Sequence, residues 1–204
     1  MRSRALRLMG GQRTVLFDTF TDPDLTLLHT HVSEDGAPWQ TYDQSTGRSR
    51  IVGNKLQSQS LVNQSRMFKH RRRFRPNGVQ RVDITWLGGT NNDSVGIGFR
   101  YCDGTSHFLV GNYAPATQSF NIGRRQGAIE STVAFVSPGS LTQNVPIEFR
   151  FEVRKSVGML FLGGTLILKT DGLIAPPRGG VLIRLGVNSA TDPIVQFDNW
   201  LVTR

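Results

Sequence analysis

The octapeptide Ile147-Glu148-Phe149-Arg150-Phe151-Glu152-Val153-Arg154 decides the fold class. Every second residue is apolar, and the residues between them alternate between acidic and basic. An extended chain therefore places the apolar side chains on one face and a ladder of charges on the other. This alternation predicts a half-buried strand of an antiparallel sheet.

Similar segments occur on both sides of this strand. Residues 159–162 and 165–168 flank Gly163-Gly164, and two glycines can take the positive φ angles of a two-residue hairpin turn. Further strands are predicted at residues 81–87, 95–101, 108–113, 181–187 and 194–202. No segment keeps a 3.6-residue apolar period over three turns, so we expect an all-β protein with two stacked antiparallel sheets.

The domain organisation predicted for the 204 residues is simple. Residues 1–13 form a basic N-terminal arm, and residues 14–204 form one sandwich domain. The single cysteine, Cys102, rules out an internal disulfide. The arm lacks the apolar core of a secretory signal, and no window has the roughly 20 apolar residues of a membrane span, so we expect neither export by this route nor a membrane partner.

Several motifs, in this order, carry a resemblance to a known family. They are Phe17-Asp18-Thr19-Phe20-Thr21-Asp22, Thr26-Leu27-Leu28-His29-Thr30-His31, Gly36-Ala37-Pro38-Trp39, Ile51-Val52-Gly53-Asn54-Lys55-Leu56, Val95-Gly96-Ile97-Gly98-Phe99-Arg100 and the closing Phe197-Asp198-Asn199-Trp200. Together they resemble the concanavalin A-like lectin/glucanase domains over residues 15–204. The resemblance implies a two-sheet antiparallel jelly-roll sandwich, here with a short N-terminal arm.

Two of these motifs also have a physical interpretation. Asp198-Asn199 inside an apolar strand predicts a bend at which the side chains bond local backbone, with Phe197 and Trp200 either on opposite faces of the strand or on the two sides of the bend. Core packing is favoured over ligand stacking for Phe197, Trp200 and Trp39.

A glycosidase active site is not predicted, although some members of the family are glycosidases. Retaining enzymes of this fold use an E-x-D-x-x-E strand, which this sequence does not contain. Glu148 and Glu152 lie about 13 Å apart along one strand face, with Arg150 between them, which is too far for a retaining pair. We therefore predict no catalytic residues and a protein that is not an enzyme.

No metal or other cofactor is predicted either. His29 and His31 would share one face of a strand and could bind a metal ion, but a third ligand is not evident and a structural role is favoured. Asp22, Asp24, Glu34 and Asp35 are typical of turn caps. Binding of Ca²⁺ by Asp22 and Asp24 is left open.

The net charge of +9 is unevenly distributed. Residues 1–100 contain 15 Lys/Arg and 8 Asp/Glu, against 9 and 7 in residues 101–204. The basic side chains gather in the arm and in the segment 66–81, where we predict a protein interface formed by Arg2, Arg4, Arg7, Arg13, Lys69, Arg71, Arg72, Arg73 and Arg75. A loop or edge strand docked on another protein is favoured over a merely solvated edge, and nucleic acid is the third alternative.

Structural proteins of tailed phages and secreted carbohydrate-binding proteins contain domains that look like this one, and fold alone does not decide between them. The favoured hypothesis is a virion structural or decoration protein, made in the host cytoplasm and attached to other virion proteins and to itself. The alternative is a lectin-like module for host-surface adhesion, with a glycan held by Trp39, Tyr42, Arg100, Tyr101, Asn112 and Tyr113. A glycoside hydrolase is the weakest hypothesis.

Overall fold

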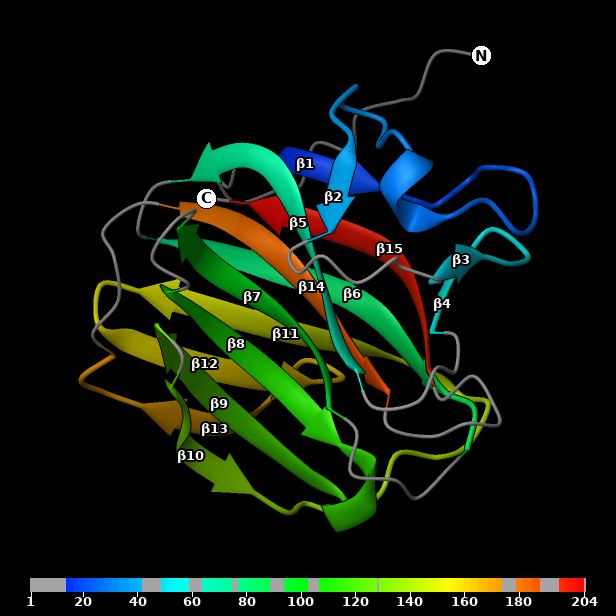
Figure 1. Cartoon of the computed structure of the whole chain (residues 1–204). Helices are drawn as coiled ribbons and strands as arrows, with labels where there is room; N and C mark the ends of the chain where they lie inside the picture. Colours follow the sequence, from blue (N-terminus) through cyan, green and yellow to red (C-terminus); the bar gives the residue numbers. More distant parts are fainter. Residues whose placement is uncertain are drawn as a thin grey trace.

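The computed structural model describes residues 14–41, 49–58, 64–74, 77–88, 94–102, 107–127, 129–173, 179–187 and 195–203, with backbone alone at 14, 15, 41, 64–74, 100–102, 186 and 187. The described residues form two stacked antiparallel sheets and two short 3-10 helices, η1 (Leu28–Thr30) and η2 (Pro115–Thr117) (Figure 1). No helix in these ranges is long and apolar enough to cross a membrane. The predicted two-sheet jelly-roll sandwich is confirmed.

One sheet has eight strands. Its order is β13 (Thr165–Thr170), β12 (Val157–Leu162), β11 (Pro146–Arg154), β6 (Gly78–Trp86), β15 (Val195–Thr203), β4 (Leu56–Gln57) and β3 (Arg50–Ile51), and β1 (Thr14–Asp18) also pairs with β15. This sheet brings the two ends of the described chain together, because β1 and β15, the first and last strands along the chain, are hydrogen-bonded to each other.

The other sheet has seven strands. Its order is β10 (Ile129–Val136), β9 (Ser119–Gln126), β8 (His107–Ala114), β7 (Val95–Cys102), β14 (Gly179–Val187), β5 (Gln64–Phe74) and β2 (Trp39–Thr41). Strands β7 to β10 follow one another along the chain as a meander, whereas β14, β5 and β2 come from distant segments.

The predicted strands occur where the alternation placed them. In β11, Phe149, Phe151 and Val153 are fully buried against the opposite sheet. Glu152 differs from the expectation of a wet face, because it is only 6% exposed. The guanidinium groups of Arg150 and Arg154 lie 3.4 and 3.0 Å from its carboxylate, and these ion pairs offset the cost of its burial.

The hairpin between β12 and β13 is also as predicted. Gly163 and Gly164 have φ angles of 55° and 82°, which favour glycine because a Cβ would be strained there. Two consecutive positive φ angles are typical of the turn that matches the twist of two antiparallel strands.

The bend predicted at Asp198-Asn199 is a β-bulge. The register of β15 against β6 shifts between Asp198 and Leu201, and Asn199 has a φ of 51°. Asp198 Oδ1 accepts a hydrogen bond from the Asn199 amide at 2.7 Å, so the side chain does bond local backbone. The extra residue turns both Phe197 and Trp200 into the core, where each is 0% exposed.

One large core lies between the sheets. Its largest fully buried side chains are Trp39, Trp200, Tyr113, Phe20, Phe120, Phe149, Phe151 and Phe197. Each buried side chain of this size stabilises the fold by about 1.5–3 kcal/mol, so the core can hold the sandwich together without a disulfide.

The basic segment 66–81 is neither a loop nor a simple edge strand. It spans β5 and the start of β6, and β5 lies between β14 and β2. Because β2 covers only the part of β5 from Phe68 to His70, β5 is the penultimate strand with a short partner on its outer side. Residues 1–13 and 75–76 lie outside the described residues.

Candidate functional site

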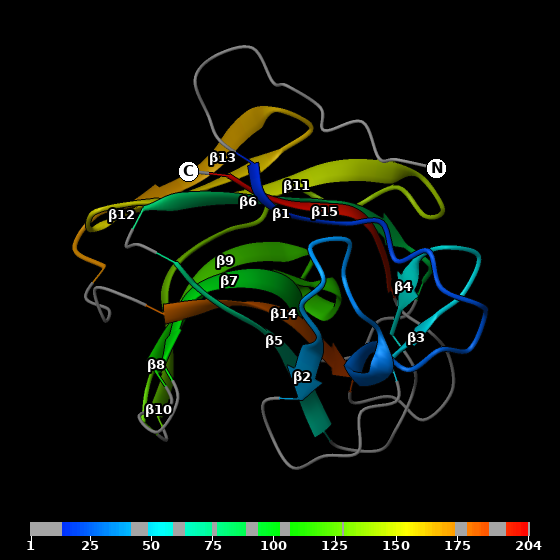
Figure 2. The same ribbon diagram turned by 90° about the horizontal axis from the view of Figure 1, so that it is seen from above.

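The concave outer face of the seven-stranded sheet is the candidate site. Seen from above, this sheet arches towards the eight-stranded sheet in its middle, so that its outer surface is hollowed (Figure 2). In β7, Val95, Ile97 and Phe99 face the core, so the residues between them face the concave surface. Such a surface lets one ligand contact several strands at once.

A row of residues crosses this face from strand to strand, and we call it the cross-sheet row. Register pairs Arg184 on β14 with Gly96 on β7, Gly96 with Asn112 on β8, Asn112 with Asn121 on β9, and Asn121 with Phe135 on β10. The row thus offers a guanidinium, two carboxamides and, at its outer end, an aromatic ring that is 72% exposed. These groups can hydrogen-bond to hydroxyls and pack against an apolar ring face.

Asn112 is fixed by its neighbours but keeps one acceptor unused. Its side chain is 2% exposed, and its Nδ2 donates to Asn121 Oδ1 at 3.1 Å. A Cβ at position 96 would lie 2.6 Å from Asn112 Oδ1, so glycine is what lets this amide lean over β7.

Two buried polar atoms on either side of Gly96 have no partner among the described residues. They are Asn112 Oδ1, an acceptor, and Arg184 Nε, a donor. A buried polar group without a partner costs about 1–3 kcal/mol. Each atom could bond a hydroxyl, Asn112 Oδ1 as acceptor and Arg184 Nε as donor, once the groups that cover it move aside, because both atoms are buried.

An apolar floor lies beside the cross-sheet row. Phe108 and Val110 on β8 and Leu182 on β14 form a cluster separate from the main core, with exposures of 0 to 1%. A Cβ at Gly98 would lie 2.9 Å from Leu182 Cγ, so the leucine lies across a glycine here as well. This floor packs tightly and therefore holds the polar groups of the face in place.

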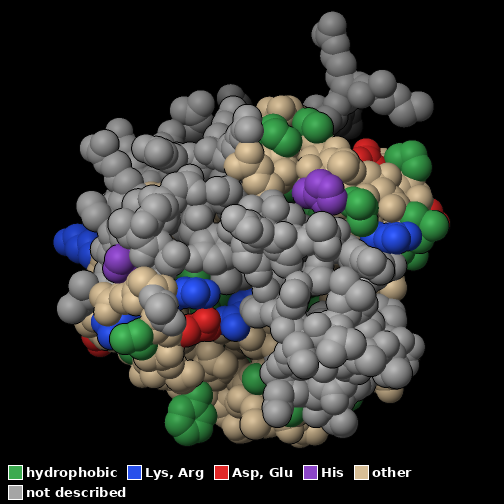
Figure 3. Space-filling model, in the orientation of Figure 1, with side chains coloured by type: hydrophobic (Ala, Val, Ile, Leu, Met, Phe, Trp, Pro, Cys, Tyr) green, Lys and Arg blue, Asp and Glu red, His purple; other side chains and the backbone are tan. Residues whose placement is uncertain are grey.

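Charged side chains extend across the same face. Arg184 Nη1 is ion-paired with Glu130 Oε1, and Glu130 lies directly opposite Arg125 in the pairing of β10 with β9. The Arg125 guanidinium carbon lies 6.0 Å from the centre of the Phe108 ring. Figure 3 views the molecule from this side and shows basic and acidic side chains together in the middle of the face. One carboxylate thus lies close to two arginines.

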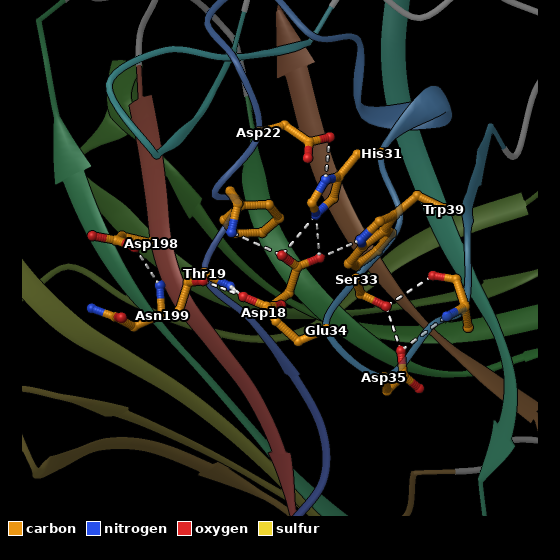
Figure 4. A network of polar contacts seen from close by, with 12 residues as sticks. Asp18, Thr19, Asp22, His31, Ser33, Glu34, Asp35, Trp39, Asp198 and Asn199 are labelled. Atoms are coloured by element: carbon orange, nitrogen blue, oxygen red, sulfur yellow. Dashed lines mark hydrogen bonds and ion pairs between the residues drawn. The ribbon is translucent and has the colours of Figure 1, made fainter. Parts of the chain in front are cut away.

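A second polar cluster is buried at the β1 end of the sandwich (Figure 4). Asp18 is 0% exposed and accepts hydrogen bonds from the Phe20 amide at 2.8 Å and from Trp39 Nε1 at 2.7 Å. His31 places Nε2 2.9 Å from Asp18 and Nδ1 2.8 Å from Asp22. Because both ring nitrogens face carboxylates, both must donate, and the imidazole is a cation.

The pKa of His31 follows from this geometry. Burial lowers the pKa, but the hydrogen bonds and charges of Asp18 and Asp22 outweigh burial and raise it to about 8. His31 is 2% exposed, so a ligand in solution cannot reach it without the loop opening. The cluster therefore anchors the segment from Asp18 to Trp39 to the core rather than forming a binding site.

The predicted geometry of the histidine pair was wrong. Residues 28–30 form η1 instead of a strand, which leaves His29 exposed while His31 is buried. Among the described residues there is no group of three side chains that could hold a metal ion. Asp22 binds His31, and Asp24 Oδ1 accepts from the Gly53 amide 29 residues away, so these two acids hold distant segments together instead of capping their own turn as predicted.

Glu34 and Asp35 bond backbone amides of the loop between β1 and β2. Glu34 Oε1 accepts from the Thr19 amide, 15 residues away, at 2.9 Å, and Asp35 Oδ1 accepts from the Ala37 amide, two residues away, at 3.3 Å. Asp35 therefore has the local capping role that the sequence predicted, whereas Glu34 ties the loop back to the end of β1.

The residues predicted to hold a glycan are only partly brought together. The core packing favoured for Trp39 is confirmed, because Trp39 is 1% exposed and packs at 4.8 Å on Trp200, so only its alternative role in holding a glycan is wrong. The exposure expected of Tyr113 was wrong, since it is 1% exposed and packs at 4.8 Å on Phe120. Asn112 lies in the cross-sheet row. Arg100 and Tyr101 belong to β7, but the structure describes only their backbone, and Tyr42 lies outside the described residues.

The predicted protein interface is not tested. Arg2, Arg4, Arg7, Arg13 and Arg75 lie outside the described residues, and only the backbone is described for Lys69, Arg71, Arg72 and Arg73 on β5. Their role in attachment stays a prediction.

Carboxylates opposite one another occur on the other sheet. Asp198 on β15 pairs in register with Asp83 on β6, on the outer face of the eight-stranded sheet. Burial raises the pKa of Asp198, and the charge of Asp83 adds to this, whereas the Asn199 amide and Lys55 act in the opposite sense. Asn199 Nδ2 donates to Asp83 Oδ2 at 2.8 Å, so the pair belongs to the bulge.

Sequence reasoning missed most of the cross-sheet row. Arg184 looked like an ordinary strand position, Asn121 and Phe135 lie in strands that the sequence did not predict, and Glu130 is 54 residues away from its partner Arg184. The one usable signal was Gly96 and Gly98 within a strand, since glycine in a strand often marks a close approach by another group.

The jelly-roll fold is of the concanavalin A-like kind, and solved structures of similar fold include lectin and glucanase domains. The carbohydrate-binding module CBM66 from Bacillus subtilis matches with a TM-score of 0.63 and 11% identity over 81% of this chain and 95% of that one. The exoplasmic/lumenal domain of VIP36, bound to Ca²⁺ and mannose, matches with a TM-score of 0.62 and 8% identity over 88% of each chain.

A Bacillus licheniformis β-glucanase matches with a TM-score of 0.56 and 12% identity, over 96% of this chain and 99% of the enzyme. At such identities the likeness concerns the fold, which serves both sugar-binding and sugar-cleaving proteins. No protein-family model matches the sequence, and no curated protein is similar to it.

Proposed function

We propose that the protein is a non-catalytic carbohydrate-binding module whose ligand lies along the cross-sheet row. The observation that carries this proposal is the pair of unpartnered atoms flanking Gly96, Asn112 Oδ1 and Arg184 Nε. A sugar hydroxyl can donate to Asn112 Oδ1 or accept from Arg184 Nε, and neighbouring hydroxyls of the same ring can reach Asn121. The solved structures of similar fold include a carbohydrate-binding module and a mannose-bound lectin domain, which supports the proposal.

Binding without hydrolysis is part of the proposal. Hydrolysis by the usual mechanisms needs two carboxyl groups on either side of the scissile bond. Glu130 is the only acidic residue in the described strands of the concave sheet, and it is ion-paired with Arg184. A reducing-sugar assay on any polysaccharide that binds should therefore show no formation of new reducing ends.

The direct test replaces Asn112 with leucine, which has a similar volume and no hydrogen-bonding groups. In isothermal titration calorimetry with each ligand found on a polysaccharide panel, we expect Asn112→Leu to weaken binding about tenfold or more, since two hydrogen-bonding groups are lost.

Gln196→Leu is the matched control, because it makes a similar change on the outer face of the opposite sheet, where Gln196 donates to Gln57 at 2.8 Å. It should leave binding unchanged. Equal losses in the two variants, or no binding to any polysaccharide, would contradict the proposal.

The virion hypothesis is compatible with a sugar site and remains a separate proposal. It concerns residues 1–13 and 66–81, whose side chains are mostly outside the described residues. Deleting residues 1–13 and measuring incorporation into particles tests it, and unchanged incorporation would remove the role of the arm.

A further inference from the structure

The geometry points to an acidic polysaccharide as the ligand of the concave face, one whose sugars carry carboxylate or sulfate groups, and we infer this on the basis of the proposed function. The anionic group would contact Arg184 and Arg125, while hydroxyls of the same chain bind along the cross-sheet row. Three features of the molecule lead to this inference: the distribution of charge between the sheets, the position of Glu130 and the scarcity of exposed aromatic rings.

Charge is divided unequally between the two sheets. The described strands of the seven-stranded sheet contain one acidic residue, Glu130, and nine basic ones, namely Arg66, Lys69, Arg71, Arg72, Arg73, Arg100, Arg124, Arg125 and Arg184. The strands of the eight-stranded sheet contain five basic and five acidic residues. The strands of this sheet therefore carry nearly all of the net charge of +9. Among the described charged side chains, Arg125, Arg184 and Glu130 lie on the concave face and give it a net charge of +1, and a positive surface attracts polyanions.

Glu130 occupies the place that a ligand carboxylate would take. Its Oε1 is ion-paired with Arg184 Nη1, and the Arg184 side chain is only 12% exposed, so the guanidinium is fixed in the face. The Glu130 side chain is 32% exposed and lies on the edge strand β10. When an incoming carboxylate or sulfate binds Arg184, Glu130 can turn to water, because its side chain is 32% exposed and the incoming anion replaces it as the partner of the guanidinium.

A polysaccharide fits this face better than single-stranded nucleic acid does. Proteins that bind single strands stack bases on exposed aromatic rings. Among the described side chains of this face, Phe108 is 0% exposed and Phe135, at the outer end of the row, is the one exposed ring. The unpartnered atoms beside Gly96 instead match hydroxyls, which every sugar carries.

Dextran, dextran sulfate and polygalacturonate of similar chain length are suitable probes for the full chain. Titration calorimetry in a series of NaCl concentrations should show that the two acidic polymers bind about tenfold or more tightly than dextran, with affinity falling as salt rises. The sulfate and carboxylate polymers separate the two sources of negative charge.

Three variants test whether the acidic polymers bind at Arg184 and Glu130. Arg184→Gln should weaken binding of the acidic polymers about tenfold or more, and Glu130→Gln should strengthen it severalfold because the competing carboxylate is gone. A gain in affinity cannot come from misfolding. Arg154→Gln, which removes a charge from the opposite sheet where Arg154 pairs with Glu152, should change nothing.

The outcomes separate this inference from the proposed function. If dextran binds as tightly as the acidic polymers and Asn112→Leu still abolishes that binding, the acidic ligand is wrong and the sugar site stands. If Arg154→Gln weakens binding as much as Arg184→Gln, or if Glu130→Gln has no effect, the placement on Arg184 is overturned. Tighter binding of single-stranded DNA than of either acidic polymer would also overturn it, and the absence of binding to every polysaccharide would remove the proposed function itself.

Discussion

At the scale of single residues, the most informative feature is the imidazolium of His31 between two carboxylates. Both of its nitrogens are satisfied by Asp18 and Asp22, and Asp18 also receives the indole hydrogen of Trp39. Because Trp39 packs on Trp200, this network joins the loop after β1 to the centre of the core. It gives His31 the structural role that the sequence favoured over metal binding.

The raised pKa of His31 predicts how stability depends on pH. An imidazole with a pKa of about 8 in the folded protein and 6.5 in the unfolded chain stabilises the fold fully below pH 6.5. This contribution of about 2 kcal/mol is lost as the pH rises through 8. Urea unfolding of the wild type at pH 6 and pH 9 should therefore show a difference that is absent from His31→Asn.

His29→Asn is the control for this measurement, since His29 is exposed on η1 only two residues away. It should keep the pH dependence of the wild type. If His31→Asn loses stability with pH as steeply as the wild type, another group is responsible for the effect.

At the scale of elements, strand positions could be predicted from sequence more readily than strand neighbours. Alternation located β11, β12, β13, β14 and β15, because one face of each strand must be buried. It could not show that β5 lies inside the seven-stranded sheet, because the basic residues of that segment interrupt the apolar alternation. Nor could it predict the ion pair of Arg184 with Glu130, since this contact depends on how the curvature of the sheet places β14 and β10.

The β12–β13 hairpin offers a test of an element that was predicted correctly. A Cβ at Gly164 would meet nothing within 4 Å, so the effect of Gly164→Ala isolates the strain at a φ of 82°. We expect it to lower the free energy of unfolding by about 1 kcal/mol, as measured by urea denaturation.

Gly164→Asn is the matched variant, because asparagine tolerates this conformation better than alanine does. It should cost less than the alanine variant. An alanine variant as stable as the wild type would mean that the turn does not have this conformation in solution.

At the scale of the whole molecule, the two sheets have different tasks. The eight-stranded sheet has balanced charge and joins β1 to β15. The seven-stranded sheet is concave and basic, and it presents the cross-sheet row. The sequence showed that the basic charge was uneven along the chain, but only the fold shows that the excess belongs to one sheet. Strand alternation gives the face of a residue only after the register of the core is known. The sequence therefore could not show that Asn112 and Tyr113, neighbours on β8, face opposite sides of the sheet.

The central claim, that sugars bind along the cross-sheet row, is tested most directly by nuclear magnetic resonance. Titrating the ¹⁵N-labelled protein with a short galacturonate oligomer should shift the backbone amides of Gly96 and Asn121, the side-chain amide of Asn112 and the guanidinium Nε–H of Arg184, while the outer face of the eight-stranded sheet stays unchanged. Shifts confined to that other face, or to the loop anchored by Asp18 and His31, would contradict the account.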